Sequence, residues 1–284
     1  METDSIAPPL RVELAAACRA ARAAGQAAMR FYGSARAVEK EGGSPVTEAD
    51  YAANRVIVEA LASAFPGDAI LSEESADSAA RLAAERVWIV DPLDGTREFL
   101  AQNGEFAVMI GLAAHGRAVL GAVYQPANDV LFAAAEGEGA SITRGGETAP
   151  LRCGEPGADG LRLVGSRSHA DPLLARMQEA LGIANVRPSG SVGVKCGSIA
   201  LGERDLYVHP VPYLKEWDTC APEAILREAG GQVADCRGEP LRYNKPDPRQ
   251  PHGIVACGPG LMDGVLARIR PVYEAARGVD RAGR

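Results

Sequence analysis

The spacing of apolar and polar residues divides the chain into two halves. In the first half, apolar residues recur at helical intervals and then give way to alternating or wholly apolar runs. This pattern predicts two helices followed by mainly antiparallel strands, with a hairpin turn at 125–129. The predicted helices lie near 10–32 and 48–64, and the strands at 69–74, 87–91, 106–114, 118–125 and 129–135.

In the second half, strand and helix patterns alternate, as is typical of an α/β arrangement. Predicted strands are 161–166, 185–188, 205–209, 231–235 and 253–257, and predicted helices are 171–181, 192–202, 218–229 and 260–276. A Gly- and Pro-containing segment at 154–157 is the predicted linker, and 246–251 is predicted to be a flexible surface loop. We therefore expect an α+β domain over 1–156, an α/β domain over 157–284, and an active site between them.

Two aspartates follow directly on the apolar run 87–90, and this is where the sequence first indicates chemistry. Pro92 restricts the backbone between them and Gly95 lets the chain turn, so that Asp91, the Leu93 carbonyl and Asp94 can converge. Two acids at the mouth of an apolar strand repel each other unless a cation lies between them. Hard oxygen ligands of this kind suit Mg²⁺.

Acids in two other segments are candidates for the same place. Glu73 ends a short strand pattern, and Asp218 opens a helical one. Asp91 can then bridge two ions, with Glu73 and the Leu93 carbonyl completing one site and Asp94 and Asp218 the other. For Asp218 a plain helix-capping role stays open, and for Glu73 a solvated loop.

Composition narrows the function classes. The 284 residues carry a net charge of −7 and a pI near 5.3, which argue against binding to a nucleic-acid backbone. With 46% hydrophobic residues and a mean hydropathy of −0.08, no apolar run is long enough to cross a bilayer. Six cysteines without Cys-x-x-Cys spacing indicate reduced thiols, and no targeting segment is visible at the N-terminus, so we expect a cytoplasmic protein. A homodimer is left open.

Four segments carry a family resemblance. Residues 44–50, 72–75, 91–99 and 216–218 are similar in order and spacing to the signature blocks of the lithium-sensitive, magnesium-dependent phosphomonoesterases of the inositol monophosphatase superfamily. The similarity runs from about 12 to about 269, and Gly-Thr-Arg-Glu-Phe at 95–99 resembles the 3′(2′),5′-bisphosphate nucleotidases of the CysQ type. The resemblance implies a layered αβαβα sandwich and two Mg²⁺ ions, with a third left open.

The resemblance also implies roles for residues that match. Glu73, Asp91, the Leu93 carbonyl, Asp94 and Asp218 would hold the metal, and Glu73 would also take part in catalysis. Thr96, oriented by Asp50, would help activate the attacking water, because a threonine hydroxyl alone is too weak a base. The amides of Gly95 and Thr96 would hold the phosphate. The resemblance further implies contact with substrate for Glu73, Asp94, Arg97 and Asp218.

A second set of residues suits a nucleotide. A strand leads into a loop of donors around Ser166, Arg167 and His169, and a Gly/Ser loop ends in Ser191 and Lys195 at a helix start. Such loops bind phosphate through amides and a positive side chain, although most Gly/Ser loops simply turn the chain. The resemblance implies that Ser166, His169, Ser191 and Lys195 grip the second phosphate and ribose.

Together these observations predict a Mg²⁺-dependent enzyme that removes the 3′-phosphate from adenosine 3′,5′-bisphosphate, giving AMP and phosphate. One alternative in the same superfamily is an inositol or sugar monophosphatase. A different class, an inactive nucleotide or metal sensor, is disfavoured because a sensor would tolerate the loss of the pair Asp50 and Thr96.

Overall fold

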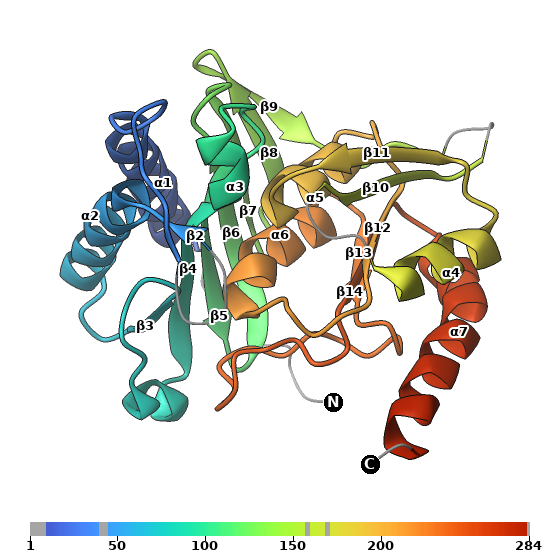
Figure 1. The fold of residues 1–284 in the computed structure, drawn as a ribbon. Helices are drawn as coiled ribbons and strands as arrows, with labels where there is room; N and C mark the ends of the chain where they lie inside the picture. Colours follow the sequence, from blue (N-terminus) through green and yellow to red (C-terminus); the bar gives the residue numbers. More distant parts are fainter. Residues whose placement is uncertain (1–9, 40–44, 157–159, 168–170, 283–284) are drawn as a thin grey trace, which may run out of the picture.

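The fold is built around two β-sheets. A computed structural model describes residues 10–39, 45–156, 160–167 and 171–282. The larger sheet has seven strands in the order β3-β4-β5-β6-β7-β8-β9, and the smaller has five in the order β11-β10-β12-β14-β13 (Figure 1). A short antiparallel pair, β1-β2, lies outside both sheets.

The elements have the following bounds. The helices are α1 (Arg11–Met29), α2 (Glu48–Ala64), α3 (Thr96–Leu100), α4 (Pro172–Leu181), α5 (Val192–Ala200), α6 (Glu216–Glu228) and α7 (Met262–Ala282), with a 3₁₀ turn, η1 (Ala79–Ala83). The first strands are β1 (Val38–Glu39), β2 (Pro45–Val46), β3 (Ala69–Ser72), β4 (Arg86–Asp94), β5 (Ala107–Ala114), β6 (Arg117–Gln125), β7 (Val130–Ala135), β8 (Gly139–Arg144) and β9 (Glu147–Leu151). The second sheet comprises β10 (Arg162–Ser166), β11 (Asn185–Ser189), β12 (Leu206–His209), β13 (Gln232–Ala234) and β14 (Ile254–Cys257).

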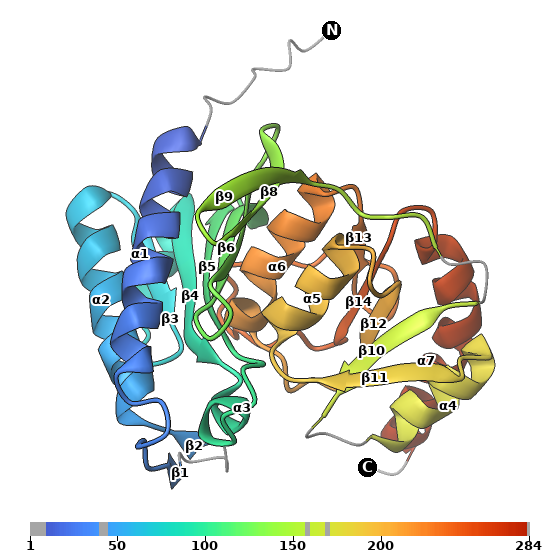
Figure 2. The ribbon, with the colours of Figure 1, turned by 90° about the horizontal axis from the view of Figure 1, so that it is seen from above.

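Helices and sheets alternate in layers, which confirms the predicted αβαβα sandwich. Helices α1 and α2 cover one face of the large sheet, α5 and α6 lie between the two sheets, and α4 and α7 cover the outer face of the small sheet (Figure 2). Three hydrophobic clusters fill the spaces between these layers. The middle cluster joins both sheets through side chains of α5 and α6, so this interior layer can present polar groups at its ends.

Helix α6 packs directly on β5 and β6 of the large sheet. Gly111 and Gly121 face each other across β5 and β6, and a Cβ added at Gly121 would lie 2.2 Å from the Ala221 carbonyl oxygen. A Cβ at Gly111 would lie 2.6 Å from the Cys220 sulfur. Only glycine permits this approach. The contact brings the first turn of α6 close to β4.

Some local predictions need correction. The sequence analysis did not predict the strands β8 and β9. Strand β9 is mostly exposed and lacks the buried alternation that marks a strand, and β8 buries only Ala140 and Ile142. The segment 246–251 is a surface loop, as predicted, but its Gln250 is only 3% exposed and donates its N–H to Leu214 O just before α6. The domain boundary near 156 stays a prediction: β9 ends at Leu151 and β10 begins at Arg162, while α5 and α6 from the second part cover the first sheet.

Candidate metal centre and active site

A β-bulge places Asp91 and Asp94 on the same side of β4. Asp91 pairs with Met109 and Asp94 with Ala107, so three steps along β4 match two steps along β5. In a regular strand, residues separated by three positions point to opposite faces. The extra residue returns Asp94 to the face of Asp91, which is the face that looks toward α6. The Leu93 amide donates to Asp91 Oδ1 at 3.0 Å and closes the bulge.

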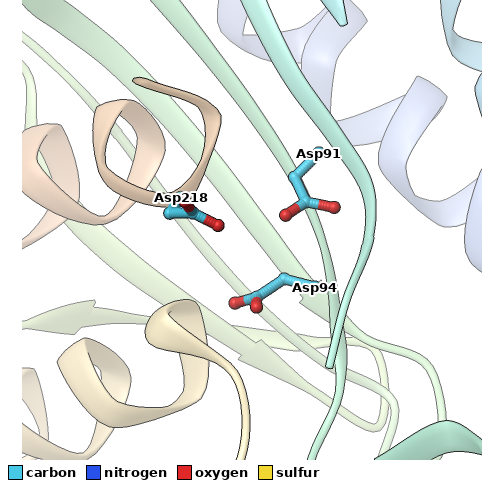
Figure 3. Close-up of side chains that lie close together, drawn as sticks. All are labelled: Asp91, Asp94 and Asp218. Atoms are coloured by element: carbon cyan, nitrogen blue, oxygen red, sulfur yellow. The ribbon is translucent and has the colours of Figure 1, made fainter. Parts of the chain in front are cut away.

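The first turn of α6 supplies the third carboxylate. Carboxylate oxygens of Asp91, Asp94 and Asp218 all lie within 4.8 Å of one another, and Figure 3 shows Asp218 on α6 facing the two aspartates of β4. Asp218 also accepts a hydrogen bond from the backbone N–H of Lys215 at 2.5 Å. The side chain therefore both caps α6 and belongs to the carboxylate cluster. The structure therefore places these three predicted residues, from β4 and α6, close together, and their role as metal ligands stays a prediction.

Electrostatics show that this cluster is suited to a cation. Burial, followed by the charges of Glu73, Asp94 and Asp218, raises the pKa of Asp91 well above its usual value. Burial and the charges of Asp94 and Glu73 do the same to the pKa of Asp218. A divalent ion would remove this mutual repulsion. Because every donor is a hard oxygen, the set fits Mg²⁺.

Glu73 follows β3 directly and is half-buried beside the cluster. Its charge acts on Asp91 and Asp218, although its oxygens lie outside the group of three that approach within 4.8 Å. The residues around it are held by Asn54 of α2, which accepts from Ser72 Oγ at 2.7 Å and donates to Glu74 O and to Ser75 Oγ at 3.3 and 3.0 Å. No sequence motif pointed to Asn54.

Asp50 and Thr96 form the second part of the site. Thr47 caps α2 and Asp50 is the third residue of the helix, and the two residues form a capping box. Asp50 Oδ2 accepts from the Thr47 amide and hydroxyl at 2.8 and 2.7 Å, while Asp50 Oδ1 accepts from Thr96 Oγ1 at 3.2 Å. The Leu93 carbonyl lies 3.3 Å from Thr96 Oγ1. Burial raises the pKa of Asp50, and its hydrogen bonds to Thr47 and Thr96 oppose that change.

Ser191 contacts Asp94, and the charge of Lys195 acts on the same carboxylate. Asp94 Oδ2 accepts from Ser191 Oγ at 2.6 Å and from the amides of Val192 and Gly193 at 2.5 and 3.3 Å. These donors open α5, so the helix N-terminus faces a negative charge. Lys195 is 4% exposed; its Nζ donates to Ser191 O at 3.1 Å and lies 5.1 Å from the centre of the Tyr207 ring. Burial lowers the pKa of Lys195, and the charge of Asp94 opposes this.

The remaining candidates lie around this cluster. Gly95 has a φ of +96° and precedes α3, where Arg97 is exposed. Ser166 ends β10 opposite Ser189 of β11, while His169 lies outside the described residues. Arg167 forms an ion pair with Glu105 at 2.8 Å, and Glu105 Oε2 also accepts from the Gly190 amide, a connection that sequence reasoning missed.

Two general expectations can be compared with the described chain. All six cysteines are free thiols. Within the described residues, no helix combines the length and apolar character needed to span a membrane.

Comparison with known proteins adds independent findings. Residues 10–272 match the model of the inositol monophosphatase family. The 3′(2′),5′-bisphosphate nucleotidase CysQ of Escherichia coli (strain K12) is 39% identical over 231 residues, which cover 80% of this chain and 92% of that protein. The 3′-phosphoadenosine 5′-phosphate phosphatase of Mycobacterium leprae is 36% identical over 235 residues, covering 79% of this chain and 82% of that protein.

Solved structures agree with these similarities. The crystal structure of CysQ from Bacteroides thetaiotaomicron superposes with a TM-score of 0.76 at 35% identity, over 87% of this chain and 97% of that chain. The inositol monophosphatase from Anabaena superposes with a TM-score of 0.72 at 29% identity, over 92% of this chain and 95% of that chain.

Proposed function

The chain belongs to the inositol monophosphatase family, and from this premise we propose that it is a metal-dependent 3′(2′),5′-bisphosphate nucleotidase. Its substrate is adenosine 3′,5′-bisphosphate, from which it removes the 3′-phosphate to give AMP and phosphate, as part of the recycling of this by-product of sulfur assimilation. Curated relatives at 36% and 39% identity are named for these activities.

The observation that carries the proposal is the cluster of Asp91, Asp94 and Asp218, whose oxygens lie within 4.8 Å of one another. We assign these residues, with Glu73 and the Leu93 carbonyl, to Mg²⁺, at two sites that share Asp91. When bound, such ions lower the pKa of the attacking water and neutralise charge on the transferring phosphoryl group. Without them, the same cluster would repel the anionic substrate.

The pair Asp50 and Thr96 is assigned to the attacking water. The Thr96 hydroxyl donates to Asp50 Oδ1 at 3.2 Å, which leaves the lone pairs of Thr96 Oγ1 able to accept a hydrogen bond from water. Asp50 is itself fixed by Thr47, so the orientation of the threonine is set before substrate arrives. The amides of Gly95 and Thr96, at the start of α3, are assigned to the phosphate.

The substrate assignment rests on a second group of residues. We assign Ser166, His169, Ser191 and Lys195 to the second phosphate and ribose, with Arg97 as a further cation at the rim. Lys195 and Ser191 are supported by their place beside Asp94, which puts the start of α5 next to the metal cluster. Ser191 donates a hydrogen bond to Asp94, and the positive charge of Lys195 acts on the same carboxylate, so both residues influence the metal cluster.

The cellular setting completes the proposal. We place the protein in the cytoplasm, with a small phosphorylated molecule as its partner and neither nucleic acid nor membrane. The six free thiols and the net charge of −7 support this assignment. A third metal ion and a homodimer stay predictions.

Phosphate release with Mg²⁺ tests the proposal. Adenosine 3′,5′-bisphosphate, inositol 1-phosphate and fructose 1,6-bisphosphate are compared at equal concentration, with Asp91→Asn as the inactive control. We expect the nucleotide to be strongly preferred. Preference for the inositol ester or the sugar ester would replace the nucleotidase assignment with the monophosphatase alternative, and no release from any of the three would favour the sensor.

A further inference from the structure

The start of α6 is held by a segment from much later in the chain, residues 244–250, which we call the α6 brace. Glu216 N donates to Pro248 O at 2.8 Å, and Gln250 N donates to Leu214 O at 2.8 Å. Lys215 and Arg249 form an antiparallel bridge between these two contacts. The brace therefore lies alongside residues 214–216, which lead directly to Asp218.

Glu216 joins α6 to the brace at its first residues. Its side chain is 0% exposed, and the two carboxylate oxygens accept from the amides of Asn244 and Lys245 at 2.6 and 2.9 Å. Lys245 Nζ lies 3.5 Å from Glu216 Oε1 and donates to Gln250 Oε1 at 2.8 Å. A buried carboxylate with two amide donors and a cation has well-defined geometry. Asp218 is two residues further along the same turn.

The other side of the brace is fixed to the segment that follows Glu73. Arg81 of η1 is 4% exposed and donates through Nη1 to Asn244 Oδ1 and to Lys245 O, both at 2.9 Å. Asn244 Nδ2 donates in return to Arg81 O and to Ala84 O at 2.9 and 3.2 Å. Asn244 has a φ of +58°, so these contacts hold a backbone conformation that is uncommon outside glycine.

Asp77 completes the connection. Arg81 Nε and Nη2 donate to its two carboxylate oxygens at 2.7 and 2.9 Å. Asp77 lies four residues after Glu73, which itself follows β3. Contacts thus run from the Glu73 segment through Arg81 and the brace to Glu216, and from there to the turn that carries Asp218.

We propose that Glu216 and Arg81 are positioning residues of the metal centre, which act through the α6 brace to set Asp218 relative to Glu73. The inference rests on the proposed function, since it requires that these two acids hold the metal. If the first turn of α6 is held less firmly, Asp218 spends less time in the geometry that Mg²⁺ requires. Replacing supporting residues of this kind commonly weakens metal binding by about 10- to 100-fold.

Metal binding to Glu216→Gln tests the proposal. The amide keeps the shape of the side chain, but it directs one N–H group at a backbone donor and loses the charge next to Lys245. We expect the Mg²⁺ dissociation constant, measured by titration calorimetry and by the Mg²⁺-dependent rise in melting temperature, to increase at least tenfold. The half-saturating Mg²⁺ concentration for phosphate release should rise in parallel, with kcat partly recovered at high Mg²⁺.

Asp205→Asn is the matched control. Asp205 is a buried acid that accepts from Arg162 at the opposite end of the small sheet, so its loss lowers stability without touching the brace. This variant should bind Mg²⁺ like the wild type. If Glu216→Gln does so as well, or if the control weakens binding equally, the positioning role is wrong.

Asn244→Gly tests the link to Arg81 if Glu216→Gln does not fold. Glycine accepts the positive φ, so the backbone is retained while the side-chain contacts with Arg81 and Ala84 are lost. It too should weaken Mg²⁺ binding, and wild-type affinity would overturn the proposal. Failure of the function itself gives a different result, because the wild type would then bind Mg²⁺ no better than Asp91→Asn.

Discussion

Replacing Asp91 with asparagine should stabilise the metal-free protein while it abolishes turnover. Asp91, Asp94 and Asp218 have oxygens within 4.8 Å of one another, and Asp91 is 2% exposed. The substitution removes one of the three charges and hardly changes the side-chain volume. It also removes the ligand that we place between the two ions, so stability and activity should change in opposite directions.

The magnitude follows from the geometry. At a separation of 4.8 Å and an effective dielectric constant near 20, two unit charges repel by about 3.5 kcal/mol. Asp91 takes part in two such pairs, so the repulsion amounts to about 7 kcal/mol if all three groups are ionised. Burial and this repulsion raise the pKa values of Asp91 and Asp218, and a raised pKa favours proton uptake, which lowers the cost. A net gain of roughly 1 to 3 kcal/mol remains, or about 2 to 5 °C in melting temperature.

The assay is thermal unfolding with EDTA and with Mg²⁺ across a range of pH. A carboxyl whose pKa is raised in the folded state costs stability when it is ionised, and that cost disappears as the pH falls through the raised pKa. In EDTA, Asp91→Asn should therefore melt above the wild type at alkaline pH, and the difference should shrink as the pH falls through the raised pKa of the cluster. Mg²⁺ should raise the melting temperature of the wild type and leave that of the variant nearly unchanged.

Asp205→Asn should change the free energy of unfolding in the opposite direction to Asp91→Asn. The Asp205 carboxylate is 3% exposed and pairs with Arg162 at 2.7 Å, so the amide should lower the free energy of unfolding, by roughly 3 kcal/mol. If Asp91→Asn is also less stable than the wild type in EDTA, the three acids do not repel as the geometry requires. Near-normal Mg²⁺-dependent activity in Asp91→Asn would refute the shared-ligand arrangement.

Three further predictions concern other parts of the site and the thiols. Thr96→Ala should lower kcat about 100-fold or more while Thr96→Ser retains most of it, because the serine can still donate to Asp50; equal loss in both would remove the hydroxyl from catalysis. Lys195→Ala should lower kcat/KM for the bisphosphate about 10- to 100-fold, which corresponds to a loss of roughly 1.5 to 3 kcal/mol. An equal fall in kcat/KM for a simple monoester would show instead that Lys195 acts through Asp94. Burial raises the pKa of Cys153 to about 11 and that of Cys196 to about 12, so native protein should react slowly with iodoacetamide at pH 8 and completely after unfolding in guanidinium, as followed by mass spectrometry.

Local patterns along the sequence determined much of this protein. The apolar run into Asp91, the turn residues Pro92 and Gly95, and the capping box at Thr47 each depend on neighbours a few positions away, so they can be recognised without the fold. The αβαβα class was implied by the resemblance to the family, whose match extends over residues 10–272, while the strand and helix patterns alone predicted an α+β half and an α/β half. The acids at Asp91, Asp94 and Asp218 were identified at this level.

Only the tertiary structure decided how these residues face one another. Asp94 shares a face with Asp91 because a bulge shifts the register against β5, and register depends on the partner strand. Asp218 reaches them because Gly111 and Gly121 admit α6 close to the sheet.

The α6 brace is the clearest case of this limit. Its composition of Pro, Asp and Arg predicts a loose loop, yet it is held by Glu216 and Arg81, residues about 30 and 160 positions away in the chain. The physical reason is that a buried carboxylate or guanidinium takes whatever donors and acceptors the folded chain brings to it. The spacing of residues along the sequence does not indicate which hydrogen-bond partners meet when they are so far apart in the chain.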